Sequence, residues 1–102
     1  MTTDQVKFED IGAGQFRIEG RLDFDNVVQA LNTSQHLFAE LHAIQLDLSG
    51  VGSIDSAGLA LLIEWVSRAR RSKCHLSFRN VPKQALALAR ISDVEKLLPL
   101  GS

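Results

Sequence analysis

The chain has 102 residues, of which 45% are hydrophobic, and its 11 basic and 12 acidic residues give a formal net charge of −1. This length and apolar content are typical of one globular domain that buries roughly 60 to 70% of the surface of its unfolded chain. The near-neutral charge excludes the broad basic footprint by which proteins bind nucleic acids or anionic lipid headgroups. We therefore expect a single domain over residues 1–102 and no charged polymer as a partner.

The start of the chain and its cysteine content indicate a compartment. Residues 1–5 lack the basic segment and apolar core of a signal peptide, and no apolar run approaches the roughly 18 residues that span a membrane. Cys74 is the single cysteine, which excludes an intramolecular disulfide and fits a reducing compartment. We expect a cytoplasmic protein that joins any membrane complex through a protein partner.

Hydrophobic patterns divide the chain into four strands and four helices. Strands are expected at residues 6–9, 15–19, 44–48 and 75–78, and long helices at 25–40 and 57–73. Pro82 suits the first turn of a third helix that runs through Leu86 and Leu88, and Asp93 suits the cap of a short helix that ends at Leu98. The order β-β-α-β-α-β-α-α predicts an α/β fold with a mainly parallel four-stranded sheet and packed helices.

The stretch from residue 46 to residue 62 joins a predicted strand to a predicted helix. Hydrophobic residues alternate with polar ones up to residue 48, and Gly50 and Gly52 then break the strand pattern. Helical spacing follows in four apolar residues, Leu59, Leu62, Ile63 and Val66. Asp55 and Ser56 therefore stand at the N-terminal cap, where side-chain oxygens accept hydrogen bonds from free backbone N–H groups.

Ser56 has two interpretations. It is a helix cap with a structural role alone, because Ser is among the preferred cap residues. Alternatively it is a phosphate acceptor, whose phosphate would bring close to two negative charges to the helix N-terminus, beside Asp55 on an exposed corner. Such a charge would chiefly disturb a partner that docks there.

Two segments carry a resemblance to a known family. Residues 55–59 (Asp-Ser-Ala-Gly-Leu) resemble the signature of STAS domains, in which Asp-Ser/Thr-x-Gly-Leu opens a helix. Residues 18–23 (Ile-Glu-Gly-Arg-Leu-Asp) resemble the strand end that precedes the first helix of that family. The resemblance covers nearly the whole chain and implies the STAS-like fold of anti-sigma factor antagonists. It also matches Ser56 with the hydroxyl that the family phosphorylates or uses for partner docking.

Two branches of the family fit the motif differently. Anti-sigma factor antagonists typically carry a second hydroxyl where Ala57 stands and a glycine where Ala60 stands. Residues 58–62 (Gly-Leu-Ala-Leu-Leu) and the tail 88–99 instead resemble MlaB-type STAS subunits of Mla phospholipid-transport ABC complexes. That resemblance implies a non-catalytic subunit, peripheral at the inner membrane, that binds and stabilises or regulates the ATPase subunit of the transporter beside its permease. The system serves the lipid asymmetry of the outer membrane.

The other branch stays open as an alternative. An anti-sigma factor antagonist is a phosphorylatable switch that binds an anti-sigma kinase. The pair Asp55 and Ser56 favours this interpretation, and Ala57 weighs against it.

The outer side of the helix after Ser56 predicts where a partner binds. At 100° per residue, Leu61, Trp65 and Arg68 fall opposite or beside the face that packs on the sheet. Trp and Arg are favoured at interface hot spots. We expect an exposed partner-binding strip formed by Asp55, Ser56, Ala57, Leu61, Trp65 and Arg68. The alternative is that Trp65 packs against a neighbouring helix of the same domain.

Four basic residues lie in the last turns of this helix: Arg68, Arg70, Arg71 and Lys73. Positive charge there complements the helix dipole, so a structural role is one interpretation. A dedicated phosphate or lipid site is the other.

No catalytic or metal-binding pattern stands out. His36, His42 and His75 are scattered, without Cys or carboxylates at zinc-like spacing, and the glycines mark turns rather than a phosphate-binding loop. After the transporter subunit and the anti-sigma factor antagonist, the third hypothesis is an enzyme that acts through Ser56. The lack of a general base within the motif of this serine weighs against it. We expect no enzymatic activity, no cofactor and no metal ion.

Overall fold

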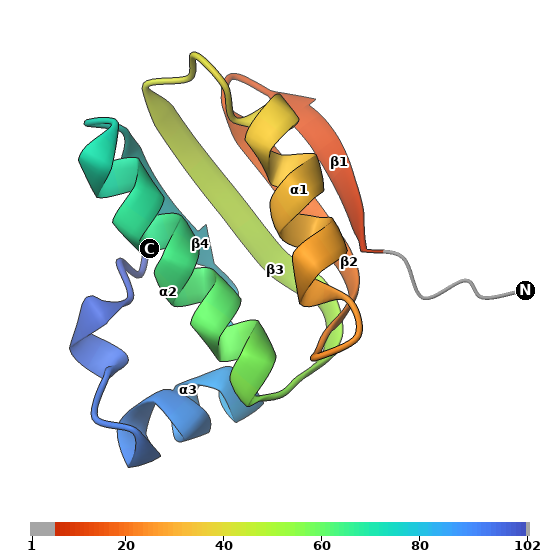
Figure 1. The fold of residues 1–102 in the computed structure, drawn as a ribbon, viewed down its shortest axis with the longest axis vertical. Coiled ribbons are helices and arrows are strands. Elements are labelled where there is room, and N and C mark those ends of the chain that lie inside the picture. Colours follow the sequence, from red (N-terminus) through yellow and green to blue (C-terminus); the bar gives the residue numbers. More distant parts are fainter. Residues whose placement is uncertain (1–5, 102) are drawn as a thin grey trace, which may run out of the picture.

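A computed structural model describes residues 6–101 (Figure 1). The elements follow the predicted order, except that the last helix is a short 3₁₀ turn. They are β1 (Lys7–Gly12), β2 (Gln15–Leu22), α1 (Val27–Leu37), β3 (Ala43–Ile54), α2 (Ser56–Arg71), β4 (His75–Arg79), α3 (Lys83–Ile91) and η1 (Glu95–Leu97).

The described strands form one sheet in the order β1-β2-β3-β4. The sheet is mixed, because β1 pairs antiparallel with β2 while β3 is parallel to both β2 and β4. A two-residue loop joins β1 to β2, and both of its residues, Ala13 and Gly14, have positive φ angles of 55° and 78°. Such a loop permits only an antiparallel pairing. The expected α/β fold is therefore present, and its parallel part is β2, β3 and β4.

β3 is longer than predicted, because Gly50 and Gly52 lie within the strand rather than after it. A Cβ atom at Gly50 would lie 2.7 Å from the backbone oxygen of Ile18 on β2. The strand register shifts beside this contact, between Arg17 and Glu19. Glycine thus allows β2 to approach β3 closely at an irregularity of the ladder, and the strand continues beyond it.

α1 and α2 lie side by side across one face of the sheet (Figure 1). The side chains beneath them are buried and apolar, and include Phe16, Ile18, Leu46 and Leu48. Between these positions the strands carry partly exposed polar side chains, including Arg17, Gln45 and Asp47. The core therefore lies between the sheet and its helices, as the alternating pattern predicts.

The helix ends differ from prediction where turns intervene. The carbonyl of Asp23 accepts hydrogen bonds from the N–H groups of both Asn26 and Val27, so a turn occupies the start of the predicted 25–40 helix. Asp93 does not cap a final helix, because its backbone is left-handed with a φ of 59° and η1 begins at Glu95. Among residues 6–101, none of the helices combines the length and apolar character that crossing a membrane requires.

Candidate functional site

The start of α2 is built around the carboxylate of Asp55. One oxygen, Oδ1, accepts a hydrogen bond from the N–H of Gly58 at 3.0 Å, so Asp55 is the N-cap. The other oxygen, Oδ2, accepts from the N–H of Phe24 at 3.2 Å. The N–H of Asp55 in turn donates to the carbonyl of Leu22. One side chain therefore joins the helix start to the loop between β2 and α1.

Ser56 is the first residue of α2, and its side chain is exposed. The interpretation of Ser56 as the helix cap is wrong, because Asp55 takes that position and supplies the capping oxygen. Within residues 6–101 the Ser56 hydroxyl has no protein hydrogen-bond partner. This leaves the hydroxyl at the positive end of the helix dipole, available to a partner or a modifying enzyme.

Gly58 allows the loop to close on the helix. A Cβ atom at this position would lie 2.1 Å from the carbonyl oxygen of Leu22 and 2.5 Å from the Cγ1 atom of Ile54. Such approaches are far inside van der Waals contact, so a side chain there would push the β2–α1 loop away from α2. The glycine of the motif is therefore explained by backbone packing.

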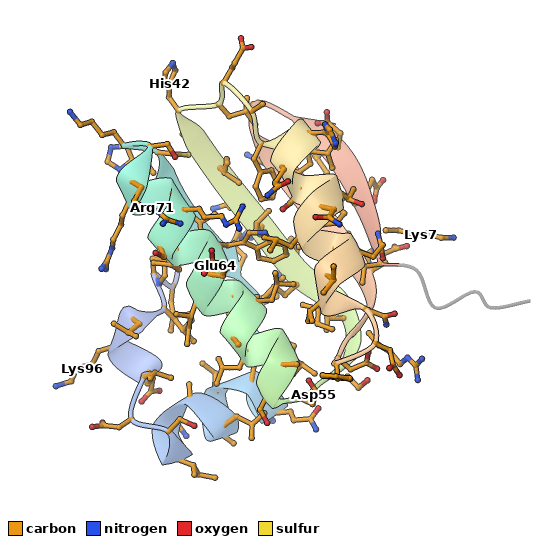
Figure 2. The ribbon with its side chains drawn as sticks, in the orientation of Figure 1. Lys7, His42, Asp55, Glu64, Arg71 and Lys96 are labelled. Carbon is orange, nitrogen blue, oxygen red and sulfur yellow. The ribbon has the colours of Figure 1, made fainter. Side chains whose placement is uncertain are left out.

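Two large apolar side chains are exposed on the same corner. Phe24 is 79% exposed in the loop that Asp55 holds, and Val28 is 68% exposed one turn later, in α1. The N-terminal ends of α1 and α2 lie at the same end of the molecule (Figure 1), where Figure 2 labels Asp55. Neither residue was predicted from the sequence, although an aromatic side chain between Asp23 and Asp25 was a usable signal.

The predicted strip along α2 is wrong in its middle. Leu61 and Trp65 are only 4% and 3% exposed, so neither faces a partner. The indole Nε1–H of Trp65 donates to the hydroxyl oxygen of Ser34 on α1 at 2.8 Å. Its ring also lies 6.1 Å from that of Phe8 and 6.0 Å from that of Phe38, between ring centroids. The alternative interpretation, packing of Trp65 against a neighbouring helix, is confirmed.

Leu61 and Trp65 are buried because α2 lies at the centre of the fold. α2 contacts the sheet and also packs against α1 and α3, so it has neighbours on more than one side. Its buried residues cover a wide arc: Gly58, Leu59, Leu61, Leu62, Trp65, Val66 and Ala69. A calculation with one buried face assigns too many of these residues to the surface.

Arg68 is far from Ser56, although both belong to α2. More than three helical turns separate them, about 18 Å along the axis. The Nε of Arg68 donates to Oε2 of Glu64 at 2.7 Å, and Arg71 lies 3.7 Å from the same oxygen. The hydrogen bond from Arg68 lowers the pKa of Glu64. Asp55, Ser56 and Ala57 thus stay together at one end of α2, and Arg68 stands near the other.

The arrangement around Ser56 offers little for catalysis or metal binding. Both carboxylate oxygens of Asp55 already accept backbone N–H groups, so this neighbour is not placed as a base for the serine. In the described part of the chain, no three His, Cys, Asp or Glu side chains are grouped so as to hold a metal ion. The arrangement instead offers an exposed hydroxyl, a fixed loop and apolar surface.

Comparisons with known proteins agree with this architecture. The family described as "Mlab, STAS domain" matches residues 9–99. No curated protein matches the chain. Among solved structures, the anti-sigma factor antagonist SpoIIAA in its unphosphorylated form has a TM-score of 0.69 at 16% identity, over 95% of this chain and 88% of SpoIIAA. The phosphorylated form of the Bacillus cell fate determinant SpoIIAA has a TM-score of 0.65 at 15% identity, over 95% and 91%.

A transporter domain shares the same fold. The murine anion transporter Slc26a9, in its inward-facing state, has a TM-score of 0.61 at 20% identity, over 83% of this chain and 14% of the transporter. At these identities the structural matches show the fold alone. The family match covers most of the sequence and includes the motif at the start of α2. The chain therefore belongs to the STAS domain family, in the group described as Mlab.

Proposed function

We propose that this protein is a non-catalytic STAS subunit that binds the ATPase subunit of an ABC phospholipid transporter on the cytoplasmic side of the inner membrane. Its binding surface is the docking corner, formed by Phe24, Val28, Asp55, Ser56 and Ala57. Docking stabilises the assembled ATPase, and the transporter serves the lipid asymmetry of the outer membrane. Leu61 and Trp65 are not part of this surface because they are buried.

One observation carries the proposal: a serine hydroxyl with no hydrogen-bond partner in residues 6–101 lies at the same end of the molecule as two exposed apolar side chains. The hydrogen bond from Phe24 to Asp55 holds the loop in place before any partner arrives. A preformed surface loses less conformational entropy on binding than a mobile one. Burial of Phe24 and Val28 would contribute about 1.5 to 3 kcal/mol each.

A kinase-controlled switch is the second candidate, and the exposure of Ser56 favours it. A phosphate here would meet the positive end of the α2 dipole but would also lie beside the carboxylate of Asp55. The similar SpoIIAA fold occurs in unphosphorylated and phosphorylated forms. In this candidate the docking corner binds an anti-sigma kinase, and the phosphate releases it.

Affinity purification from gently solubilised cells of the natural host tests both candidates. The tagged wild type is compared with Phe24→Glu, and with Ile11→Glu as a matched control. Ile11 is 53% exposed near the end of β1, and its substitution makes the same charge change away from the docking corner. We expect wild type and Ile11→Glu to recover an ABC ATPase and its permease, and Phe24→Glu to lose both. Recovery of a soluble ATP-binding kinase instead would support the switch, and full recovery with Phe24→Glu would contradict the docking corner.

A further inference from the structure

The end of the molecule opposite Ser56 contains a pocket of about 330 Å³. It lies between the C-terminal ends of α1 and α2 and the start of β3, and Figure 2 shows His42 at this end and Asp55 at the other. Apolar side chains dominate its wall, namely Phe38, Leu41, Ile44, Trp65, Ala69 and Leu76. Its size falls in the range of small-molecule sites, whose walls are also largely apolar.

The charged side chains of the wall are the guanidinium of Arg68, a hydrogen-bond donor, and the carboxylate of Glu40, an acceptor. Gln35 and His42 have no side-chain hydrogen bond to any residue within the described range 6–101. Arg68 uses its Nε for Glu64, which leaves the other guanidinium N–H groups available. Cys74 also lines the pocket, and burial raises the pKa of its thiol, so it remains uncharged near neutral pH. An occupant with an acceptor headgroup and an apolar body suits this lining.

Charge at this end of the molecule also favours an anion. The last turns of α2 carry Arg68, Arg70 and Arg71, and Lys73 follows directly. Their four positive charges outnumber the negative charges nearby. Those are the two carboxylates of Glu40 and Glu64 and roughly half a negative charge at the C-terminal end of each of the two helices. The excess is local, because the whole chain has a net charge of −1.

We propose that this pocket binds a single-chain carboxylate amphiphile, a medium-chain fatty acid. The hydrocarbon tail lies against Trp65, Phe38 and Leu76, and the carboxylate accepts hydrogen bonds from Arg68. Planar guanidinium groups are well matched to carboxylates. The site does not depend on the docking corner, so its test can fail without affecting the proposed partner.

Fluorescence of Trp65 gives a direct test, because it is the single tryptophan and lines the pocket. Decanoate is titrated below its micelle concentration, with 1-decanol as the neutral probe of the same chain length. We expect a saturable change in emission with a dissociation constant below about 1 mM for decanoate, and at least tenfold weaker binding of decanol. Absence of a saturable change, or equal binding of the two probes, would overturn the proposal.

Two variants of α2 test the headgroup contact. Arg68→Gln removes the guanidinium at the pocket, whereas Arg71→Gln makes the same charge change at a residue outside the pocket wall. A lost charged hydrogen bond corresponds to about a tenfold weakening or more, and we expect it for Arg68→Gln alone. Equal weakening in both variants would show a general charge effect and contradict the assigned contact.

The position of the tail is tested by a filled pocket and by chemical shifts. Ala69→Phe places a ring in the wall and is expected to abolish decanoate binding. Because Ala69 is buried, its folding must first be verified by circular dichroism. A second measurement, the NMR amide chemical shifts of the wild type, needs no substitution and so does not depend on whether that variant folds. We expect decanoate to shift Leu41, Ile44 and Leu76, and shifts confined to Phe24 and Val28 would overturn the site.

Discussion

The carboxylate of Asp55 and the backbone N–H of Phe24 form a hydrogen bond of 3.2 Å across 31 residues of sequence. The same carboxylate caps α2 through the N–H of Gly58. One side chain therefore contributes both to helix capping and to the placement of the loop. We expect a protein without this side chain to lose stability at the helix start and one hydrogen bond that positions Phe24.

Asp55→Ala is expected to lower the free energy of unfolding by about 1 to 2 kcal/mol, because it removes an N-cap. It should also weaken capture of the partner by more than the stability loss explains, since the Phe24 loop becomes free. Urea unfolding and affinity purification measure the two effects. Asp25→Ala, an exposed carboxylate in the same loop, is the control and should change stability by less than about 0.5 kcal/mol. Equal effects of the two variants would contradict the role of Asp55.

Ser56→Ala should leave stability within about 0.5 kcal/mol of wild type, because Asp55 and not Ser56 caps the helix. Ser56→Asp should fold equally well but lose the partner, because its charge lies at the centre of the docking corner. Unfolding curves and affinity purification of both variants check these outcomes. A large loss of stability in Ser56→Ala would show that the hydroxyl has a structural role after all.

Gly58→Ala should destabilise the protein by about 1 to 3 kcal/mol, because its methyl group would overlap the carbonyl oxygen of Leu22. Gly52→Ala is the matched control, since a Cβ atom there meets nothing within 4 Å. The difference between the two urea midpoints is the measurement. If both variants unfold at the same midpoint, the close approach of loop and helix is not what requires glycine.

Ser34→Ala leaves the buried indole N–H of Trp65 without its acceptor, and should cost about 1 to 3 kcal/mol. Ser67→Ala, at an exposed position of α2, is the control with the same chemical change. Trp65→Phe removes the donor, so adding Ser34→Ala to it should cost less than in the wild type. Strict additivity in this double-mutant cycle would exclude the coupling.

The lowered pKa of Asp47 predicts that the protein loses stability in acid. Partial burial raises the pKa of Asp47, but hydrogen bonds from Asn80 and Ser49 and the charge of Arg79 outweigh it, so the net pKa is below its ordinary value. A lowered folded pKa contributes stability above the unfolded pKa of about 4, and this contribution disappears as pH falls through the folded value. Asp47→Asn should flatten that part of the curve of unfolding free energy against pH. A curve for Asp47→Asn that keeps the full slope of the wild type in this pH range would contradict the role of Asp47.

The local pattern predicted the elements that depend on neighbouring residues. Alternation located part of each strand, helical spacing located α2, and the Asp-Ser pair marked the start of that helix. Cap chemistry and glycine turns act over a few residues, so they can be recognised in the sequence. The predicted length of β3 was wrong at Gly50. This glycine permits a close approach to Ile18 of β2 and does not end the strand, and that contact cannot be read from neighbouring residues.

The sequence alone therefore determined the order of the elements, the family motif and the helix start that carries Ser56. The tertiary structure alone decided which sides of α2 are free, because burial depends on neighbours that lie far away in the chain. Trp65 is buried since Ser34 and Phe38 of the α1 region lie against it. Phe24 is exposed since no other element within residues 6–101 covers the loop that Asp55 holds. This long-range packing is not encoded in helical periodicity.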